Sequence, residues 1–238
     1  MGATSGWGHG PECDTHAERL SGRQSTVLVA GACVVLAAAN ALLVALPSGW
    51  DVAAALGGAV GVLTLGRWRG LAWQQMGLGA DTWRSGLRWG VAAAAAIAVG
   101  YAVILVLPFG RDTSNDLAAP AGDTLWVTAL LLIPLRTVIL EELTFRGVLW
   151  GLIERRSGTR WALLGTSVAF GCWHVAPALS LADRTEGAVW LSVLGVLTFT
   201  ALAGVLLGEL RRRSGSVIAP AALHWAANAL GLVAASLA

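Results

Sequence analysis

Long apolar runs dominate this sequence and leave few folds open to it. Seven stretches rich in Ala, Val, Leu and Gly follow one another, at residues 26–47, 52–66, 87–109, 125–153, 161–178, 188–210 and 217–237. A helix needs about 20 apolar residues to cross a bilayer, and its backbone must be hydrogen-bonded within the segment. Only 13% of the 238 residues are charged, against about 25% in soluble domains. The sequence predicts an all-α, polytopic transmembrane helix bundle of about seven spans, within a range of six to eight.

Two of the runs differ in length from a simple span. The run at 125–153 has about 29 residues and would be roughly 43 Å long as a helix, so we expect it to tilt, to kink near Pro134 or to extend beyond the membrane. The run at 52–66 is short and rich in glycine. Residues 70–86 mix polar and aromatic side chains and are typical of an interfacial stretch between two spans.

The arginines predict the orientation, because cytoplasmic loops carry an excess of basic residues. All 16 basic residues are Arg, which is typical of GC-rich bacterial genomes. If the N-terminus is cytoplasmic, the cytoplasmic side receives most of them: Arg19, Arg23, Arg67, Arg69, Arg84, Arg88, Arg155, Arg156, Arg160, Arg211, Arg212 and Arg213. The opposite side receives only Arg111 and Arg184. We therefore expect a multi-pass protein of a bacterial plasma membrane, with its N-terminus inside and its C-terminus outside.

The chain divides into three parts by composition. Residues 1–24 are polar and rich in glycine, as expected of a disordered cytoplasmic tail. Residues 25–110 form the N-terminal transmembrane helices, and residues 111–238 form a helical core that holds most of the intramembrane polar groups. The net charge of +2 gives no reason to expect a nucleic-acid partner. Three widely spaced cysteines, an odd number, imply no disulfide framework.

Strongly polar side chains are rare inside the predicted spans, which makes them candidates for function. Each ionisable residue costs about 2.5–3.5 kcal/mol to insert at the centre of a membrane helix. Spans four, five and seven contain Arg136, Glu141, Glu142, Arg146, His174, His224 and Asn228. Asn40 in the first span, and the Gly204 and Gly208 pair in the sixth, are better explained by helix packing.

Helical geometry predicts which of these polar groups share a face of a helix and which do not. Glu142 and Arg146 are four residues apart, so they share a face and can form an ion pair. Glu141 is turned by about 100° from Glu142 and points elsewhere. His224 and Asn228 are also four residues apart and project to one side of the seventh span. The simplest arrangement places four side chains around one water-accessible cavity between spans four, five and seven: Glu141, His174, His224 and Asn228.

This set contains the groups that a hydrolase needs. Glu141 can act as general base on a water molecule, and His174 can orient that water or bind a metal. His224 and Asn228 can donate hydrogen bonds to an oxyanion. Alternatively, Glu141, His174 and His224 supply three ligands for a zinc ion with an open fourth position. Since the sequence lacks a His-Glu-x-x-His motif, such a site would be assembled from separate helices.

Three motifs in order resemble those of the CPBP (CAAX protease and bacteriocin-processing) intramembrane proteases, which include type II CAAX prenyl endopeptidases. The motifs are Glu141-Glu142-Leu-Thr-Phe-Arg146, Phe170-Gly-Cys-Trp-His174 and His224-Trp-Ala-Ala-Asn228. The resemblance covers residues 125–232, so it makes 111–238 the expected catalytic core. It implies that Glu141 and His174 activate water, that His224 and Asn228 stabilise the oxyanion, and that Glu142 and Arg146 form a supporting ion pair. Both a metal-dependent and a metal-free glutamate mechanism are compatible with it.

The expected function is that of an intramembrane endopeptidase that cuts a peptide or membrane-protein substrate near the membrane surface. Two alternatives stay open. Intramembrane Glu and His also form the proton relays of transporters, although no inverted repeat, which would favour transport, is found in the sequence. The other alternative is an inactive scaffold of the immunity-protein type. Cleavage that depends on Glu141 and His174 separates the first hypothesis from the other two.

Overall fold

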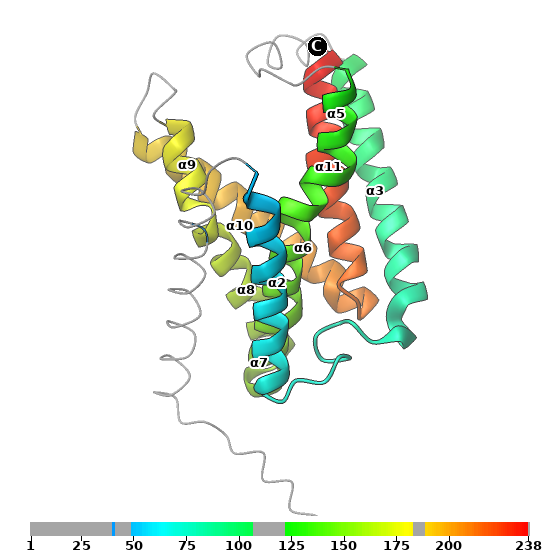
Figure 1. Cartoon of the computed structure of the whole chain (residues 1–238), viewed down its shortest axis with the longest axis vertical. Coiled ribbons are helices and arrows are strands. Elements are labelled where there is room, and N and C mark those ends of the chain that lie inside the picture. The colour runs from blue at the N-terminus through cyan, green and yellow to red at the C-terminus, as the bar shows by residue number, and fades with distance from the viewer. Residues whose placement is uncertain (1–39, 41–48, 107–121, 183–188, 238) are drawn as a thin grey trace, which may run out of the picture.

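The fold is helical throughout the part of the chain that the computed structural model describes, which is residue 40 and residues 49–106, 122–182 and 189–237 (Figure 1). No strand occurs in these ranges, so the predicted all-α fold is confirmed. Four of the described helices are long and apolar enough to cross a membrane: Ala80–Val106, Asp123–Ser157, Val189–Ser214 and Ile218–Leu237. The protein is therefore an integral membrane protein built as a polytopic helix bundle.

These four helices correspond to the predicted spans 87–109, 125–153, 188–210 and 217–237. The predicted span 52–66 is helix α2 (Asp51–Trp68), which is not among the four. The predicted tail 1–24 lies outside the described residues, as does the predicted span 26–47 apart from Asn40. The total of seven spans stays a prediction.

The longest helix changes its winding several times along its length. It runs from α5 (Asp123–Val127) through the π-helical segments η2 (Thr128–Leu132) and η3 (Pro134–Val138), α6 (Ile139–Glu142) and the π-helical η4 (Leu143–Leu149) to α7 (Trp150–Ser157). Pro134 has no N–H to donate, and the helix bends between α5 and α6, as expected near this proline (Figure 1). The two glutamates lie on α6, between two π-helical segments. Such segments are frequent at functional sites.

The predicted span 161–178 is not one helix. Helix α8 (Thr159–Trp173) ends where α9 (Val175–Ala182) begins, with His174 between them at φ −87° and ψ 8°. The chain turns here through a hydrogen bond from His174 N to Gly171 O, and α9 continues with Ala178 N donating to His174 O. Pro177 explains the break, because it has no N–H for the carbonyl one turn earlier.

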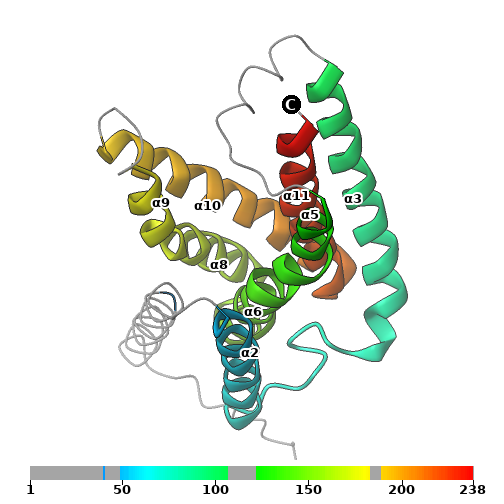
Figure 2. The same cartoon turned by 45° about the horizontal axis from the view of Figure 1, so that its top comes forward.

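The helices pack in pairs (Figures 1 and 2). Helix α11 (Ile218–Leu237) lies along α3 (Trp83–Val106), which follows the short 3₁₀ turn η1 (Ala80–Thr82). Helix α10 (Val189–Ser214) packs on α8, and α2 packs on α6. A Cβ atom on Gly204 would lie 2.9 Å from Ser167 Cα, and one on Gly208 would lie 2.5 Å from Leu163 Cδ1. The close packing predicted for this glycine pair is confirmed.

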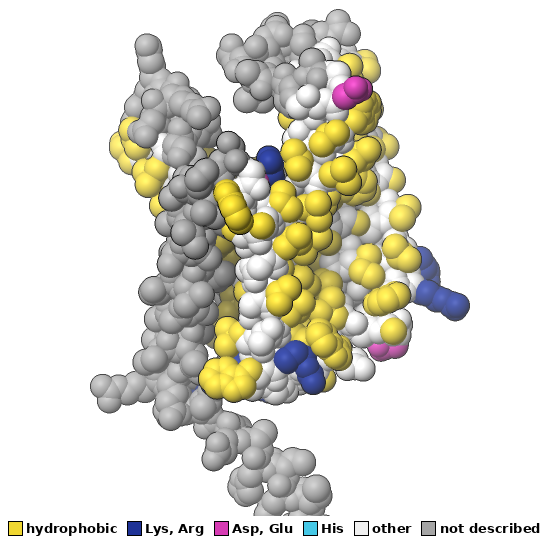
Figure 3. Space-filling view, viewed as in Figure 1, with side chains coloured by type: hydrophobic (Ala, Val, Ile, Leu, Met, Phe, Trp, Pro, Cys, Tyr) yellow, Lys and Arg dark blue, Asp and Glu magenta, His cyan; other side chains and the backbone are white. Residues whose placement is uncertain are grey.

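The outer surface is apolar over much of the face shown in Figure 3, as expected of helices that face lipid. Large exposed side chains on α3 and α10 include Val91, Val99, Ile104, Leu194, Phe199 and Leu202. The C-terminal ends of α2, α7 and α10 lie in the lower half of Figure 1, as do the N-terminal ends of α3, α8 and α11. These are the helix ends that carry most of the arginines, so the described part of the chain agrees with the arginine distribution from which the orientation was predicted.

Arg211, near the end of α10, forms hydrogen bonds both to the segment that connects α2 with α3 and to the long helix 123–157. Its Nε donates to Arg146 O at 3.0 Å, and its Nη2 donates to Gln75 O at 3.1 Å. Gly77 has φ +71°, and a Cβ atom there would lie 2.6 Å from Arg211 Nε. Val217 N donates to Gly77 O at 3.0 Å. These bonds fix the backbone of η4, one turn after the two glutamates.

Candidate active site

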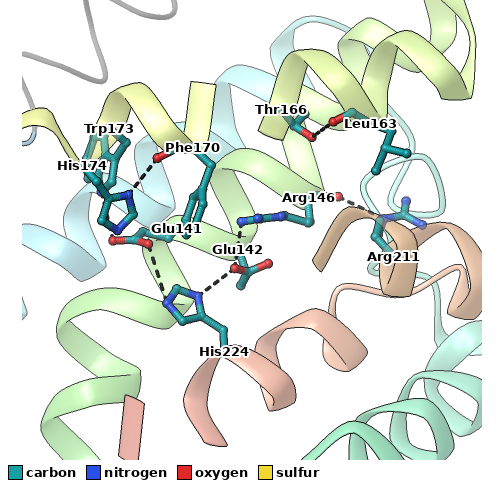
Figure 4. A network of polar contacts seen from close by, with 10 residues as sticks. All are labelled: Glu141, Glu142, Arg146, Leu163, Thr166, Phe170, Trp173, His174, Arg211 and His224. Carbon is teal, nitrogen blue, oxygen red and sulfur yellow. Dashed lines mark hydrogen bonds and ion pairs between the residues drawn. The ribbon is translucent and has the colours of Figure 1, made fainter. Parts of the chain in front are cut away.

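Glu141 and Glu142 are adjacent on α6, and both are buried, yet their carboxylates have different partners (Figure 4). Glu142 contacts Arg146 and His224, whereas Glu141 contacts Trp173. The turn of about 100° per residue in an α-helix separates the two carboxylates. Sequence reasoning predicted this divergence, and it divides the site into two halves.

The first half is built on Glu142. Its Oε1 lies 2.9 Å from Arg146 Nη1 and 2.9 Å from His224 Nδ1. Arg146 is fully buried, and its guanidinium carbon lies 4.2 Å from the centre of the Phe170 ring. The ion pair expected from the spacing is present. Since an ionised carboxylate only accepts hydrogen bonds, the shared oxygen also holds the N–H of His224 on Nδ1.

The second half is built on Glu141. Its Oε1 accepts a hydrogen bond from Trp173 Nε1 at 3.0 Å. Its Oε2 is buried and has no hydrogen-bond partner among the described residues. The nearest charged or titratable nitrogen found for this oxygen is His224 Nε2 at 3.9 Å, which is beyond hydrogen-bond range. One oxygen of Glu141 is therefore fixed by the protein, and the other is available to a small molecule such as water.

His174 approaches the same carboxylate from the break between α8 and α9. Its Nδ1 lies 2.8 Å from Phe170 O. A carbonyl oxygen can only accept, so Nδ1 carries the proton and Nε2 is left with a lone pair when the ring is neutral. Figure 4 shows the ring directed toward Glu141, and the two groups interact electrostatically. The break caused by Pro177 thus places this histidine beside the glutamate.

Asn228 does not share these contacts. It lies one turn after His224 on α11, on the same face, as predicted. Its side chain is exposed, and it forms no hydrogen bond within the described ranges. The structure therefore brings Glu141, His174 and His224 together (Figure 4) and leaves Asn228 outside this group, on the exposed surface of α11.

The zinc hypothesis for Glu141, His174 and His224 has less support from the geometry. Within the residues that the structure describes, no three His, Cys, Asp or Glu side chains are grouped so that they could hold a metal ion. Nδ1 of His224 binds Glu142 and Nδ1 of His174 binds a backbone carbonyl, which leaves Nε2 of each ring as the nitrogen that could bind a metal, but the three side chains do not form a ligand group as they are placed. As placed, these residues do not fit a three-ligand site, and the zinc set stays a prediction.

Sequence reasoning missed the contact between Trp173 and Glu141. It treated the indole as a lining or packing group, because a tryptophan in an apolar span is usually lipid-facing or packed. The packing contact predicted for Asn40 is present, since its Nδ2 donates to Trp173 O at 2.7 Å, but its partner was not predicted. The available signals were the position of Trp173 directly before His174 and the position of Pro177 four residues after Trp173.

One protein family matches the part of the chain that holds these side chains. The model of the family described as type II CAAX prenyl endopeptidase Rce1-like matches residues 123–230, a range that includes every side chain of the site except Asn40. Comparisons with curated proteins and with solved structures gave no significant match.

Proposed function

We propose that this chain, whose residues 123–230 match the type II CAAX prenyl endopeptidase Rce1-like family model, hydrolyses peptide bonds within the membrane with Glu141 as the general base. The family assignment supports an intramembrane endopeptidase in general. The observation that carries the finer proposal is the buried Oε2 of Glu141, which has no partner among the described residues and faces His224 Nε2 at 3.9 Å.

The separation between these two atoms suits a hydrolytic water. A water molecule can lie at about 2.8 Å from each of two atoms that are 3.9 Å apart. Glu141 Oε2 accepts a proton from this water as its oxygen attacks the carbonyl carbon of the substrate. Glu141 then returns the proton to the amide nitrogen as the C–N bond breaks. His174, with its lone pair on Nε2, orients the water beside the same carboxylate.

The oxyanion formed by this attack needs hydrogen-bond donors. We assign this role to Asn228 and to the imidazolium form of His224, which carries an N–H on Nε2 as well as on Nδ1; the two residues share one face of α11. Asn228 has an exposed amide that can reach a substrate carbonyl. Glu142 and Arg146 do not touch the substrate in this mechanism. They hold Nδ1 of His224, so that Nε2 keeps its position at the reacting atoms.

The depth of the site indicates where the substrate is cut. His224 is six residues after Ile218, the first residue of α11, which is about 9 Å along the helix. That end of α11 follows the arginines of α10, which mark the cytoplasmic side by the positive-inside rule. We therefore propose cleavage of a peptide or membrane protein near the cytoplasmic surface of a bacterial plasma membrane.

The test is cleavage of a fluorescence-quenched peptide library by the purified protein in liposomes. Glu141→Gln keeps the size of the side chain and removes the base, so we expect a loss of roughly 100- to 10,000-fold in rate. The matched control is Glu209→Gln, on the exposed end of α10, which should cleave at the wild-type rate. Equal cleavage by Glu141→Gln and the wild type would overturn the proposal. So would an inactive wild type that moves protons across the liposome membrane, since this would favour a transporter.

A further inference from the structure

Trp173 holds one oxygen of the proposed base. The indole is buried at 8% exposure, and its Nε1 donates to Glu141 Oε1 at 3.0 Å. The ring packs edge-to-face on Phe145 at 5.9 Å between centroids. Because the indole is held by its contact with Phe145, its N–H keeps the Glu141 carboxylate in one orientation, with Oε2 toward His224. Loss of the N–H would let the carboxylate rotate, because no other hydrogen bond to either Glu141 oxygen is found in the described residues.

The backbone of Trp173 is fixed from outside the Rce1-like domain. In a continuous helix the carbonyl of Trp173 would accept a bond from the N–H of residue 177, but that residue is Pro177, which has none. Asn40 Nδ2 supplies the missing donor at 2.7 Å. Asn40 is itself buried at 8% exposure, and a buried carbonyl without a hydrogen-bond donor would be destabilising. A side chain 133 positions earlier in the chain therefore completes the end of α8.

We propose that Trp173 is a positioning residue for Glu141, and that Asn40 fixes Trp173 from the N-terminal part of the chain. The inference rests on the proposed function, since it assigns the base that is positioned. Asn40, Trp173 and Glu141 are joined by two hydrogen bonds that run from the N-terminal part of the chain to Oε1 of the proposed base, and so leave Oε2 for the water. The side chains of the proposed mechanism all lie within residues 123–230, whereas the orientation of the base depends also on residue 40.

The first experiment replaces Trp173 with its benzothiophene analogue by site-specific incorporation. The analogue keeps the shape of the indole and its contact with Phe145, and it lacks the N–H. We expect kcat to fall roughly 10- to 100-fold, the size of one hydrogen bond to a charged group, with KM within about twofold of the wild type. If Trp173 only stabilises the fold, the molecules that do fold should keep the wild-type kcat. The measured rate is therefore divided by the concentration of active sites.

Trp150 provides the matched control. Its Nε1 also donates to a carboxylate at 3.0 Å, that of Glu154, and its ring is also buried. Trp150 lies on α7 and belongs to no part of the proposed mechanism. The same analogue at position 150 should leave both kcat and KM unchanged. Full kcat for the analogue at position 173 would overturn the proposal, as would an equal loss at position 150.

The second experiment tests the link to Asn40. Asn40→Leu keeps the approximate size and removes the donor, so we expect a fall in kcat of about threefold to tenfold. If Asn40 acts through Trp173, its effect should largely disappear in a chain that already carries the analogue at position 173. Independent, multiplicative losses would overturn the link. A wild type with no peptidase activity defeats the proposed function itself, whereas an active wild type with a fully active analogue defeats only the role of Trp173.

Discussion

Nδ1 of His224 lies 2.9 Å from Oε1 of Glu142, and the same oxygen lies 2.9 Å from Nη1 of Arg146. One carboxylate oxygen thus joins α11 to the long helix and balances a guanidinium that is fully buried. The histidine presents its other nitrogen to Glu141 as a consequence. Glu142 is bonded to Arg146 and His224 through Oε1, whereas Oε2 of Glu141 faces Nε2 of His224 at 3.9 Å and is the oxygen that we assign to the chemistry.

Glu142→Gln should destabilise the protein strongly. The substitution keeps the shape of the side chain and leaves Arg146 buried with no carboxylate charge beside it. Breaking a buried ion pair in this way costs about 3–5 kcal/mol. The measurement is the free energy of unfolding in mild detergent, followed by circular dichroism. A change under about 1 kcal/mol would contradict the role given to this pair.

The double variant of Glu142→Gln with Arg146→Met provides the control. It removes both charges, so it should recover part of the stability that Glu142→Gln loses. Its activity should stay low, because His224 has lost the carboxylate that holds its Nδ1. If stability recovers and activity does not, the ion pair of Glu142 with Arg146 stabilises the fold, and the bond of Glu142 to His224 serves catalysis.

Hydrolysis should survive the removal of divalent metals. In the proposed mechanism Glu141 itself takes the proton from the water, and the described side chains include no group of three or more His, Cys, Asp or Glu that could hold a metal ion. We therefore expect phenanthroline and EDTA to leave kcat within about twofold of the untreated enzyme. Elemental analysis of the same sample should find less than one zinc per chain. Loss of activity on chelation, with recovery on adding zinc, would instead favour the zinc set of Glu141, His174 and His224.

The sequence predicted contacts within one helix better than contacts between helices. The pairing of Glu142 with Arg146 follows from a spacing of four residues, which is fixed by helix geometry. The contact of Trp173 with Glu141 depends on how α8 is rotated against α6, and an apolar run gives little information on that rotation. The helical fold itself was predictable, because a chain in lipid must satisfy its backbone within each segment. The break at His174 was missed since the apolar run continues through it, although Pro177 marked the place.

Gly204→Ala should weaken the packing of α8 on α10. The added Cβ atom would lie 2.9 Å from the Cα of Ser167, and a backbone atom cannot move aside without separating the two helices. We expect a loss of stability of roughly 1–3 kcal/mol, measured as unfolding in detergent. Gly195→Ala on the same helix meets nothing within 4 Å, so it should gain up to about 1 kcal/mol from helix propensity. Equal effects at the two positions would contradict this packing.

Pro177→Ala should lower activity without lowering stability. Alanine restores an N–H at position 177, so the carbonyl of Trp173 gains a donor within its own helix. Helices α8 and α9 can then run on through His174, whose ring would turn with the helix and leave its place beside Glu141. We expect kcat to fall at least tenfold while the thermal midpoint stays equal or rises, because the joined helix would lose no hydrogen bond and would gain the one from the N–H of residue 177 to Trp173 O. Pro220→Ala, in the first turn of α11, is the control: a proline there removes no helical bond, so kcat should not change. Wild-type kcat in Pro177→Ala would mean that the break at His174 does not serve the site.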